Sequence, residues 1–173
     1  MATASPKLAL RPFLPEDTPL LAEIFRESIL ELTSDDYSEA QQEAWIERAD
    51  DLEAFAARLG KQLTLIATLD GSPVAFASLA GNTKIDMLFV HPIVSGQGAA
   101  ALLIDALEKL AGARGADKLT VDASDTARGF FEKRGYVAQQ RNSVSVGDEW
   151  LANTTLSKTL SQTIAKPEAS QPS

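Results

Sequence analysis

The sequence predicts an α/β fold with a mixed sheet, and three observations support this prediction. Segments with the two-residue alternation of strands recur along the chain, and segments with helical spacing separate them. The expected order is strand, helices, three strands, helix, strand, helix and two strands. The length of 173 residues and the hydrophobic content of 45% suit one compact domain with a buried core.

The first part of the chain predicts one strand followed by helices. Residues 8–13 alternate as a strand does, and apolar residues at helical spacing then continue to about Leu32, with Asp17 as the expected N-cap. Two further helices are expected at 37–48, capped by a serine, and at 52–59, ended by a glycine.

The middle of the chain changes from helical to strand periodicity. Residues 62–69 and 73–79 flank an Asp-Gly pair and predict an antiparallel hairpin. A buried strand at 85–90 follows, and then a long helix whose apolar positions between 99 and 110 form one continuous face.

The remaining segments complete the expected sheet. Residues 118–122 predict a strand and residues 126–133 a short helix that ends at an Arg-Gly pair. Two final strands are expected at 136–140 and 150–156, joined through residues 141–149.

These elements indicate one domain with short extensions. We expect a flexible N-terminus at 1–7, the domain at 8–158 and a frayed, polar tail at 159–173. The first segment is too short and too polar for a signal peptide, and no apolar run reaches the roughly 18 residues that a membrane span needs. The expected localisation is cytoplasmic, without a membrane partner.

Composition excludes several classes of site. There is no cysteine and only one histidine, so thiolate sites and sites with two imidazoles are excluded, and no metal is expected. The net charge of −8 argues against a nucleic-acid partner. Between Glu16 and Glu53 thirteen carboxylates accompany only Arg26 and Arg48. These carboxylates are either solvated helix faces or a negative rim that attracts a cationic amine substrate.

The segment 90–101, VHPIVSGQGAAA, is the strongest functional feature. A buried strand leads into a loop with Gly96 and Gly98, and a helix of small residues begins at once. Helix starts offer free N–H groups and partial positive charge, which suit phosphate. Taken alone, the segment is equally consistent with a tight strand-helix turn. It is not a dinucleotide fingerprint, because Ala101 stands at the third glycine position, and no P-loop lysine follows.

Two ordered motifs resemble the GNAT superfamily of N-acetyltransferases. Residues 85–103 are similar to its acetyl-CoA signature, in which a strand ending in V-x-P leads into Gln/Arg-x-x-Gly-x-Gly/Ala and a helix, here at 95–100. Residues 124–137 are similar to its later motif, and 8–17 to its usual opening, so the resemblance covers about 8–158. The later motif's alanine, paired aromatics and Gly-aromatic step are Ala127, Phe130, Phe131, Gly135 and Tyr136.

The resemblance implies both a fold and an activity. The fold would be a mixed, mostly antiparallel sheet of about six or seven strands, flanked by helices and splayed at 85–90 away from 118–122. The activity would be acetyl transfer from acetyl-CoA to a primary amine of a small molecule or peptide, by direct attack in a ternary complex. The enzyme would be a monomer or homodimer. The alternative is a catalytically degenerate GNAT fold that binds CoA or a partner protein.

The resemblance also implies which residues bind the cofactor. The backbone at 88–90 would pair with the pantetheine arm, and the amides at 96–100 would hold the pyrophosphate. Ser95 stands where glutamine or arginine is usual, and Phe131 where many relatives have the tyrosine that protonates the departing thiolate. The expected cofactor-binding residues are Leu88, Phe89, Val90, Ser95, Gly96, Gln97, Gly98, Ala99, Ala100, Ala127 and Phe131.

Asp86 and Tyr37 are the candidate catalytic residues. The attacking amine must be neutral, so a base has to accept a proton from its ammonium form. Asp86 lies near the expected splay, two residues beyond Lys84, the position where some relatives carry a glutamate base, and both would share a strand face. A structural bond to backbone or to an arginine is the alternative for Asp86. Tyr37 begins the second helix and could donate a proton or bind substrate, and a water chain without a dedicated acid is the other possibility.

Overall fold

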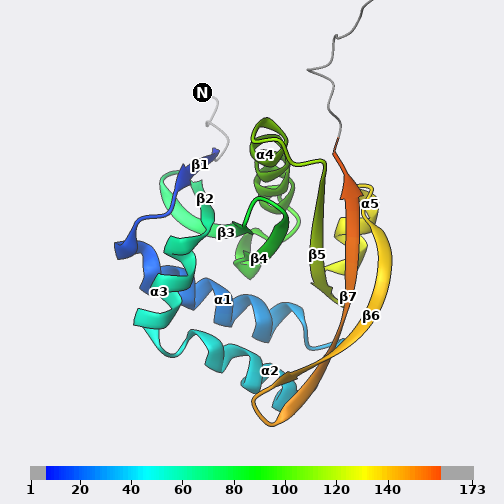
Figure 1. The fold of residues 1–173 in the computed structure, drawn as a ribbon. Coiled ribbons are helices and arrows are strands. Elements are labelled where there is room, and N and C mark those ends of the chain that lie inside the picture. Colours follow the sequence, from blue (N-terminus) through cyan, green and yellow to red (C-terminus); the bar gives the residue numbers. More distant parts are fainter. Residues whose placement is uncertain (1–6, 161–173) are drawn as a thin grey trace, which may run out of the picture.

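One open, seven-stranded mixed sheet runs through residues 7–160, the part of the chain that the computed structural model describes (Figure 1). The strand order is β1-β2-β3-β4-β5-β7-β6, and every neighbouring pair is antiparallel except β4 and β5. The predicted mixed, mostly antiparallel sheet is therefore confirmed. The strands are β1 (Leu8–Pro12), β2 (Leu63–Leu69), β3 (Ser72–Ala80), β4 (Lys84–Val90), β5 (Lys118–Ser124), β6 (Val137–Val146) and β7 (Glu149–Thr159).

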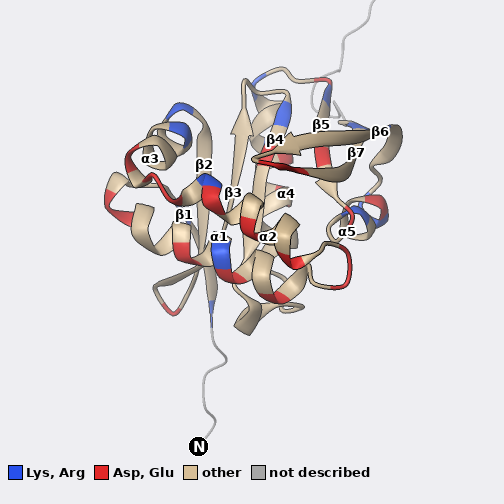
Figure 2. Cartoon of the chain, turned by 90° about the horizontal axis from the view of Figure 1, so that it is seen from below, with Lys and Arg blue, Asp and Glu red and all other residues tan. Residues whose placement is uncertain are grey.

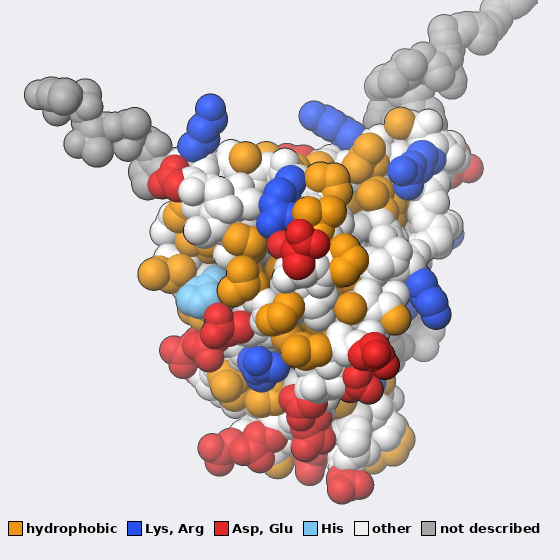
Figure 3. All heavy atoms as spheres, turned by 90° about the vertical axis from the view of Figure 1, so that its left-hand side faces the viewer, with side chains coloured by type: hydrophobic (Ala, Val, Ile, Leu, Met, Phe, Trp, Pro, Cys, Tyr) orange, Lys and Arg blue, Asp and Glu red, His pale blue; other side chains and the backbone are white. Residues whose placement is uncertain are grey.

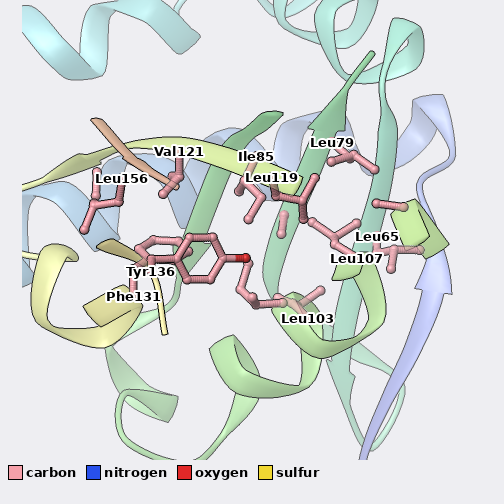
Figure 4. Close-up of a cluster of buried hydrophobic side chains, with 14 of the residues drawn as sticks. Leu65, Leu79, Ile85, Leu103, Leu107, Leu119, Val121, Phe131, Tyr136 and Leu156 are labelled. Atoms are coloured by element: carbon pink, nitrogen blue, oxygen red, sulfur yellow. The ribbon is translucent and has the colours of Figure 1, made fainter. Parts of the chain in front are cut away.

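Helices cover both faces of the sheet. Because side chains alternate along a strand, Ile66 and Phe76 pack against α1 and α3, while Leu65 and Ala75 pack against α4. Figure 4 shows the core on the α4 side, where Phe131 and Tyr136 lie next to each other. The helices are α1 (Thr18–Leu32), α2 (Glu39–Ile46), α3 (Leu52–Lys61), α4 (Ala99–Ala113) and α5 (Arg128–Lys133), with 3-10 turns at Pro15–Asp17, Glu47–Ala49 and Pro92–Val94.

The sheet splays between β4 and β5, as the resemblance implied. These parallel strands pair only where Lys84 lies opposite Thr120 and Ile85 opposite Val121. Beyond this point β5 stays paired with β7 as far as Ser124, so its other edge and the rest of β4 face an opening (Figure 1). Backbone groups on both edges are therefore free to bond to something other than a strand.

A β-bulge in β4 sets the direction of Asp86. Ser78 of β3 lies opposite Met87, and Leu79 lies opposite Ile85, so Asp86 has no partner residue in β3. A bulge can turn two consecutive side chains to one face. Met87 packs with α1 and α3, and Asp86 bonds to α3, so both side chains lie on that face.

The expected helix caps form, although one of them acts differently. Ser38 caps α2, because its hydroxyl accepts a hydrogen bond from the Gln41 amide at 3.1 Å. Asp17 stands at the N-cap position of α1, but its side chain bonds to Arg11 and to the Leu14 amide instead. The start of α1 is therefore held by the contact of Asp17 with Arg11 of β1.

Several element boundaries differ from the prediction, and both final strands extend beyond their expected ends, with β7 continuing to Thr159. Residues 141–146 belong to β6, which forms a long hairpin with β7 through a turn at 147–148. This edge strand carries mostly polar side chains, and only Val144 and Val146 turn towards α2. Its apolar alternation is therefore too short to be recognised in the sequence. The helix α3 continues through Gly60 to Lys61.

The expected terminal segments 1–7 and 159–173 lie outside the described residues, apart from Lys7, Thr159 and Leu160. No helix in the described part of the chain is long and apolar enough to cross a membrane.

Candidate functional site

The loop between β4 and α4 presents a row of backbone amides. Gly96 and Gly98 have φ angles of +80° and +91°, which side-chain-bearing residues rarely adopt, and α4 begins directly after them. The first helical bond runs from the Leu102 amide to the Gly98 carbonyl at 3.0 Å. In the described structure no acceptor is bonded to the amides of Gly96, Gly98, Ala99 or Ala100, whereas the Gln97 amide donates to Val94.

A cavity of about 350 Å³ lies over these amides, and we call it the loop cavity. Its walls come from α1, from residues 88–90 and 94–96, from 98–101 at the start of α4, and from 124–130. Small side chains line the helix start, so an anionic group can approach the backbone closely. A larger side chain at Ala100 would fill this space.

A second cavity, of about 290 Å³, opens where β4 and β5 diverge, and we call it the splay cavity. Residues 84–89 and 121–124 form its two strand walls, and the β6–β7 hairpin closes one side. Aromatic rings form the remaining wall, where Tyr37 and Trp45 pack edge to face at 5.5 Å and Phe25 packs on Phe89 at 4.6 Å.

The two cavities adjoin each other. The five residues that line both are Trp45, Leu88, Phe89, Ser124 and Ala127. Ser124 ends β5 at this junction, and its hydroxyl oxygen accepts a hydrogen bond from the Ala127 amide at 3.1 Å. No described residue accepts the hydroxyl proton of Ser124, so this proton is available at the junction.

The predicted cofactor residues gather around the junction, with two exceptions. Nine of the eleven line the loop cavity: Leu88, Phe89, Val90, Ser95, Gly96, Gly98, Ala99, Ala100 and Ala127. Gln97 belongs to the same loop, but its side chain points away from the cavity, and its side-chain nitrogen Nε2 donates to the Ile93 carbonyl at 3.3 Å. Phe131 is 1% exposed, packs on Tyr136, and lines the splay cavity instead.

Asp86 lies in the wall of the splay cavity, held by Arg58 of α3 and by Gln62, the residue that follows the helix. The Arg58 Nε and Nη2 atoms lie 2.9 and 2.8 Å from its Oδ2, and the Gln62 amide nitrogen lies 2.8 Å from the same atom. All three bonds fall on Oδ2. The Oδ1 atom has no bond from a described residue, and the side chain is 19% exposed.

Tyr37 also lines the splay cavity, but its hydroxyl is fully bonded. It donates to the Ala152 carbonyl at 2.6 Å and accepts from the Asp125 amide at 2.9 Å. Burial raises the pKa of this hydroxyl above its ordinary value, so its proton is held more tightly than in water. Tyr37 does not begin α2 as expected but precedes it by two residues, and its hydroxyl ties this segment to β7 and to the residue after β5 behind the cavity.

Comparisons with known proteins agree with this geometry. The sequence profile of the Acetyltransferase (GNAT) domain matches residues 33–156. The uncharacterized N-acetyltransferase YafP of Escherichia coli K12 is 32% identical over 146 residues, which are 84% of this chain and 92% of YafP. This chain belongs to the GNAT acetyltransferases.

Solved structures of GNAT enzymes share the fold. A GCN5-related N-acetyltransferase from Rhodopseudomonas palustris is 64% identical, with a TM-score of 0.87 over 92% of this chain and 99% of that one. The PaiA N-acetyltransferase from Thermoplasma acidophilum, solved in complex with coenzyme A, is 20% identical, with a TM-score of 0.73 over 88% of this chain and 99% of that one. The chain is thus an N-acetyltransferase with a GNAT fold.

The acidic stretch of this GNAT enzyme lies outside the walls of both cavities, although Asp36 borders the loop cavity by accepting a hydrogen bond from the Thr126 hydroxyl at 2.7 Å. None of the thirteen carboxylates between Glu16 and Glu53 lines either of them. Figure 2 shows acidic residues along the layer of α1, α2 and α3, and on the face in Figure 3 most of them gather on the lower half. Solvated helix faces and a negative rim both place these carboxylates outside the cavity walls. Among the described residues, no group of His, Asp and Glu side chains could hold a metal ion.

Sequence reasoning did not single out Ser124, the first residue of the later motif, or Arg48, which belongs to no motif, although both line the GNAT cavities. The sequence pattern around Ser124 gives a weak indication of its place. A serine three residues before the alanine of the motif is typical of a turn whose side chain caps the following helix. Arg48 carried a compositional signal, as one of two bases in the acidic stretch.

Proposed function

We propose that this enzyme transfers an acetyl group from acetyl-CoA to a primary amine of a small molecule or peptide, by direct attack in a ternary complex. The observation that supports this most is the meeting of two cavities at the splay of the sheet. One offers free backbone amides at a helix start, and the other offers a carboxylate to an acceptor. Their shared wall brings the two substrates together.

The loop cavity fits acetyl-CoA. The amides of Gly96 and 98–100 would bind the pyrophosphate, and the free edge of β4 beyond Ile85 would pair with the pantetheine arm. A family member, PaiA, has been solved with coenzyme A. When bound, acetyl-CoA supplies the acetyl group as a thioester and leaves as the thiol.

The splay cavity fits the acceptor amine. We propose that Asp86 accepts a proton from the ammonium group through Oδ1, which leaves the nitrogen lone pair free to attack the acetyl carbon. Arg58 and Gln62 fix the carboxylate through Oδ2 and so orient Oδ1. A new N–C bond then forms while the C–S bond breaks, and the electron pair of that bond goes to sulfur. The acylated nitrogen gives up its second proton, which passes to the sulfur, so that CoA leaves as the thiol.

We assign the hydrogen bond to the departing sulfur to Ser124 and the acceptor wall to Tyr37. Ser124 stands at the junction with a free hydroxyl proton, whereas the Tyr37 proton is bonded to Ala152 and tightly held. Phe131, where a tyrosine acid is usual in relatives, has no proton to give. In this enzyme a serine takes the place of that tyrosine.

These two assignments predict that removing the Ser124 hydroxyl mainly lowers kcat, whereas removing the Tyr37 hydroxyl mainly lowers stability. Ser124→Ala should lower kcat by roughly 10- to 100-fold, because a donor to developing negative charge is lost. Ser124→Thr, which keeps the hydroxyl, should restore much of it. Tyr37→Phe should lower the free energy of unfolding by about 1–3 kcal/mol, because it leaves the Ala152 carbonyl and Asp125 amide unpaired, with a smaller loss in kcat. Steady-state kinetics and thermal unfolding measure both, and a larger kcat loss in Tyr37→Phe would reverse the assignment.

The transfer itself is tested by thiol release from acetyl-CoA with a panel of primary amines. We expect amine-dependent thiol release well above the rate of acetyl-CoA hydrolysis without amine, together with the N-acetylated product in the mass spectrum. The family match and the N-acetyltransferase relatives do not favour a degenerate fold. Thermal stabilisation by acetyl-CoA without any amine-dependent release would nevertheless support that alternative and contradict the proposal.

A further inference from the structure

We propose that the acceptor carries a carboxylate as well as its amine, and that Arg48 binds this carboxylate. The inference rests on the proposed function and adds the class of acceptor. Within that class, the splay cavity fits amino acids and related molecules whose remaining group is apolar.

The charges that line the splay cavity do not cancel. Asp86 is paired with Arg58, with a shortest N–O distance of 2.8 Å, and Asp122 is paired with Lys84 at 2.8 Å. Arg48 also lines the cavity and makes no hydrogen bond or ion pair with a described residue. The described walls therefore carry one uncompensated positive charge, inside a protein whose net charge is −8.

The second carboxylate of the cavity is already engaged. Burial alone would raise the pKa of Asp122, but hydrogen bonds from Lys84 and Thr155 outweigh it and hold the pKa below its ordinary value. The charged form of Asp122 is thus stabilised within the protein. Neither Asp122 nor Lys84 is left over to bind an acceptor group, which leaves this role to Arg48.

Arg48 is placed to meet a ligand in the cavity. It lies in the 3-10 turn Glu47–Ala49, three residues after Trp45, whose ring forms part of the aromatic wall. The next residue, Ala49, is fully buried and fixes this turn. The Arg48 side chain itself is exposed and unpaired, so no existing bond must break before it binds an anion. A guanidinium binds a carboxylate through two parallel hydrogen bonds.

These features define the acceptor chemically. Its amine would meet Asp86, its carboxylate would meet Arg48, and an apolar group would pack on the aromatic wall. A cationic acceptor without a carboxylate would instead meet the positive charge of Arg48, which disfavours it. The carboxylates of the acidic stretch do not line the cavity, so they do not oppose an anionic group directly.

The test compares L-amino acids with their amides. The probes are phenylalanine, leucine and methionine, each as the free acid and as the α-amide, with thiol release from acetyl-CoA as the readout. The wild-type enzyme should prefer the acids in kcat/KM. The amine of an amide is the less basic of the two and is more often neutral, so amine reactivity alone would favour the amides.

Arg48→Ala should lower kcat/KM for the acids by roughly 10- to 100-fold, because a hydrogen-bonded ion pair is lost. It should leave kcat/KM for the amides and the KM for acetyl-CoA within about twofold. Arg26→Ala is the matched control, since Arg26 belongs to the same acidic stretch and lines neither cavity. This control should leave every parameter unchanged.

Three results would overturn the inference while leaving the proposed function intact. They are a wild-type preference for amides, an equal effect of Arg48→Ala on acids and amides, and an effect of Arg48→Ala on the acetyl-CoA KM alone. If no amine in any panel accepts an acetyl group, the proposed function itself fails, and the inference fails with it.

Discussion

The Ala100→Glu variant is expected to lose acetyl-CoA affinity by roughly 100-fold or more while it remains folded. Ala100 lies in the first turn of α4 and lines the loop cavity, with its side chain partly exposed. A glutamate there would stand close to the pyrophosphate, and two like charges about 4 Å apart near a protein surface repel by several kcal/mol. The same carboxylate favours the helix, because the first turn of a helix carries partial positive charge.

Titration calorimetry with acetyl-CoA, together with thermal unfolding, measures both halves of this result. Ala100→Gln is the matched control, since it adds nearly the same volume without the charge and should cost less affinity. A substitution at Gly98 is less suitable, because the φ angle of +91° would strain any side-chain-bearing residue and mix folding with binding. Wild-type affinity in Ala100→Glu would show that the pyrophosphate lies elsewhere.

The loop cavity could be predicted from sequence because its chemistry is local. A strand, two glycines and a helix of small residues are consecutive in the chain, and together they determine which amides are free. The later motif at 124–137 then indicated that this loop binds a phosphate group and is not only a tight turn. The position of the loop cavity on the sheet could be predicted from the same segment. The loop follows β4 directly, and β4 also provides the edge that splays from β5.

The splay cavity could not be predicted in the same way, because its residues meet only in the folded chain. Asp86 and Arg58 are 28 positions apart, and the bulge that turns Asp86 to the α3 face depends on the register of β3. Tyr37 meets the Ala152 carbonyl 115 positions away. The strand at 141–146 was not predicted because most of its side chains are polar, so an alternation of apolar residues is hard to recognise. Sequence periodicity therefore predicted the elements well but not the pairs of side chains between them.

The Asp86→Asn variant is expected to lower kcat by about 100-fold or more while acetyl-CoA affinity stays within about twofold. Asparagine keeps the shape of the side chain and can still accept a hydrogen bond from Arg58, but it cannot accept a proton from the acceptor amine. Because Asp86 lies outside the loop cavity, the amides that bind the cofactor are unaffected. Steady-state kinetics across pH, with calorimetry for acetyl-CoA, measures both quantities.

Asp17→Asn is the matched control for losing an Asp–Arg pair. Asp17 bonds to Arg11 at 2.8 Å, and this hydrogen bond holds the pKa of Asp17 below its ordinary value, but neither residue lines the loop cavity or the splay cavity. Asp17→Asn should therefore reduce stability and leave kcat nearly unchanged. If Asp86→Asn behaves in the same way, with turnover preserved at every pH, then Asp86 serves only to anchor α3 to β4. If turnover alone collapses, the free Oδ1 atom in the splay cavity is the base, and the bulge in β4 exists to aim it.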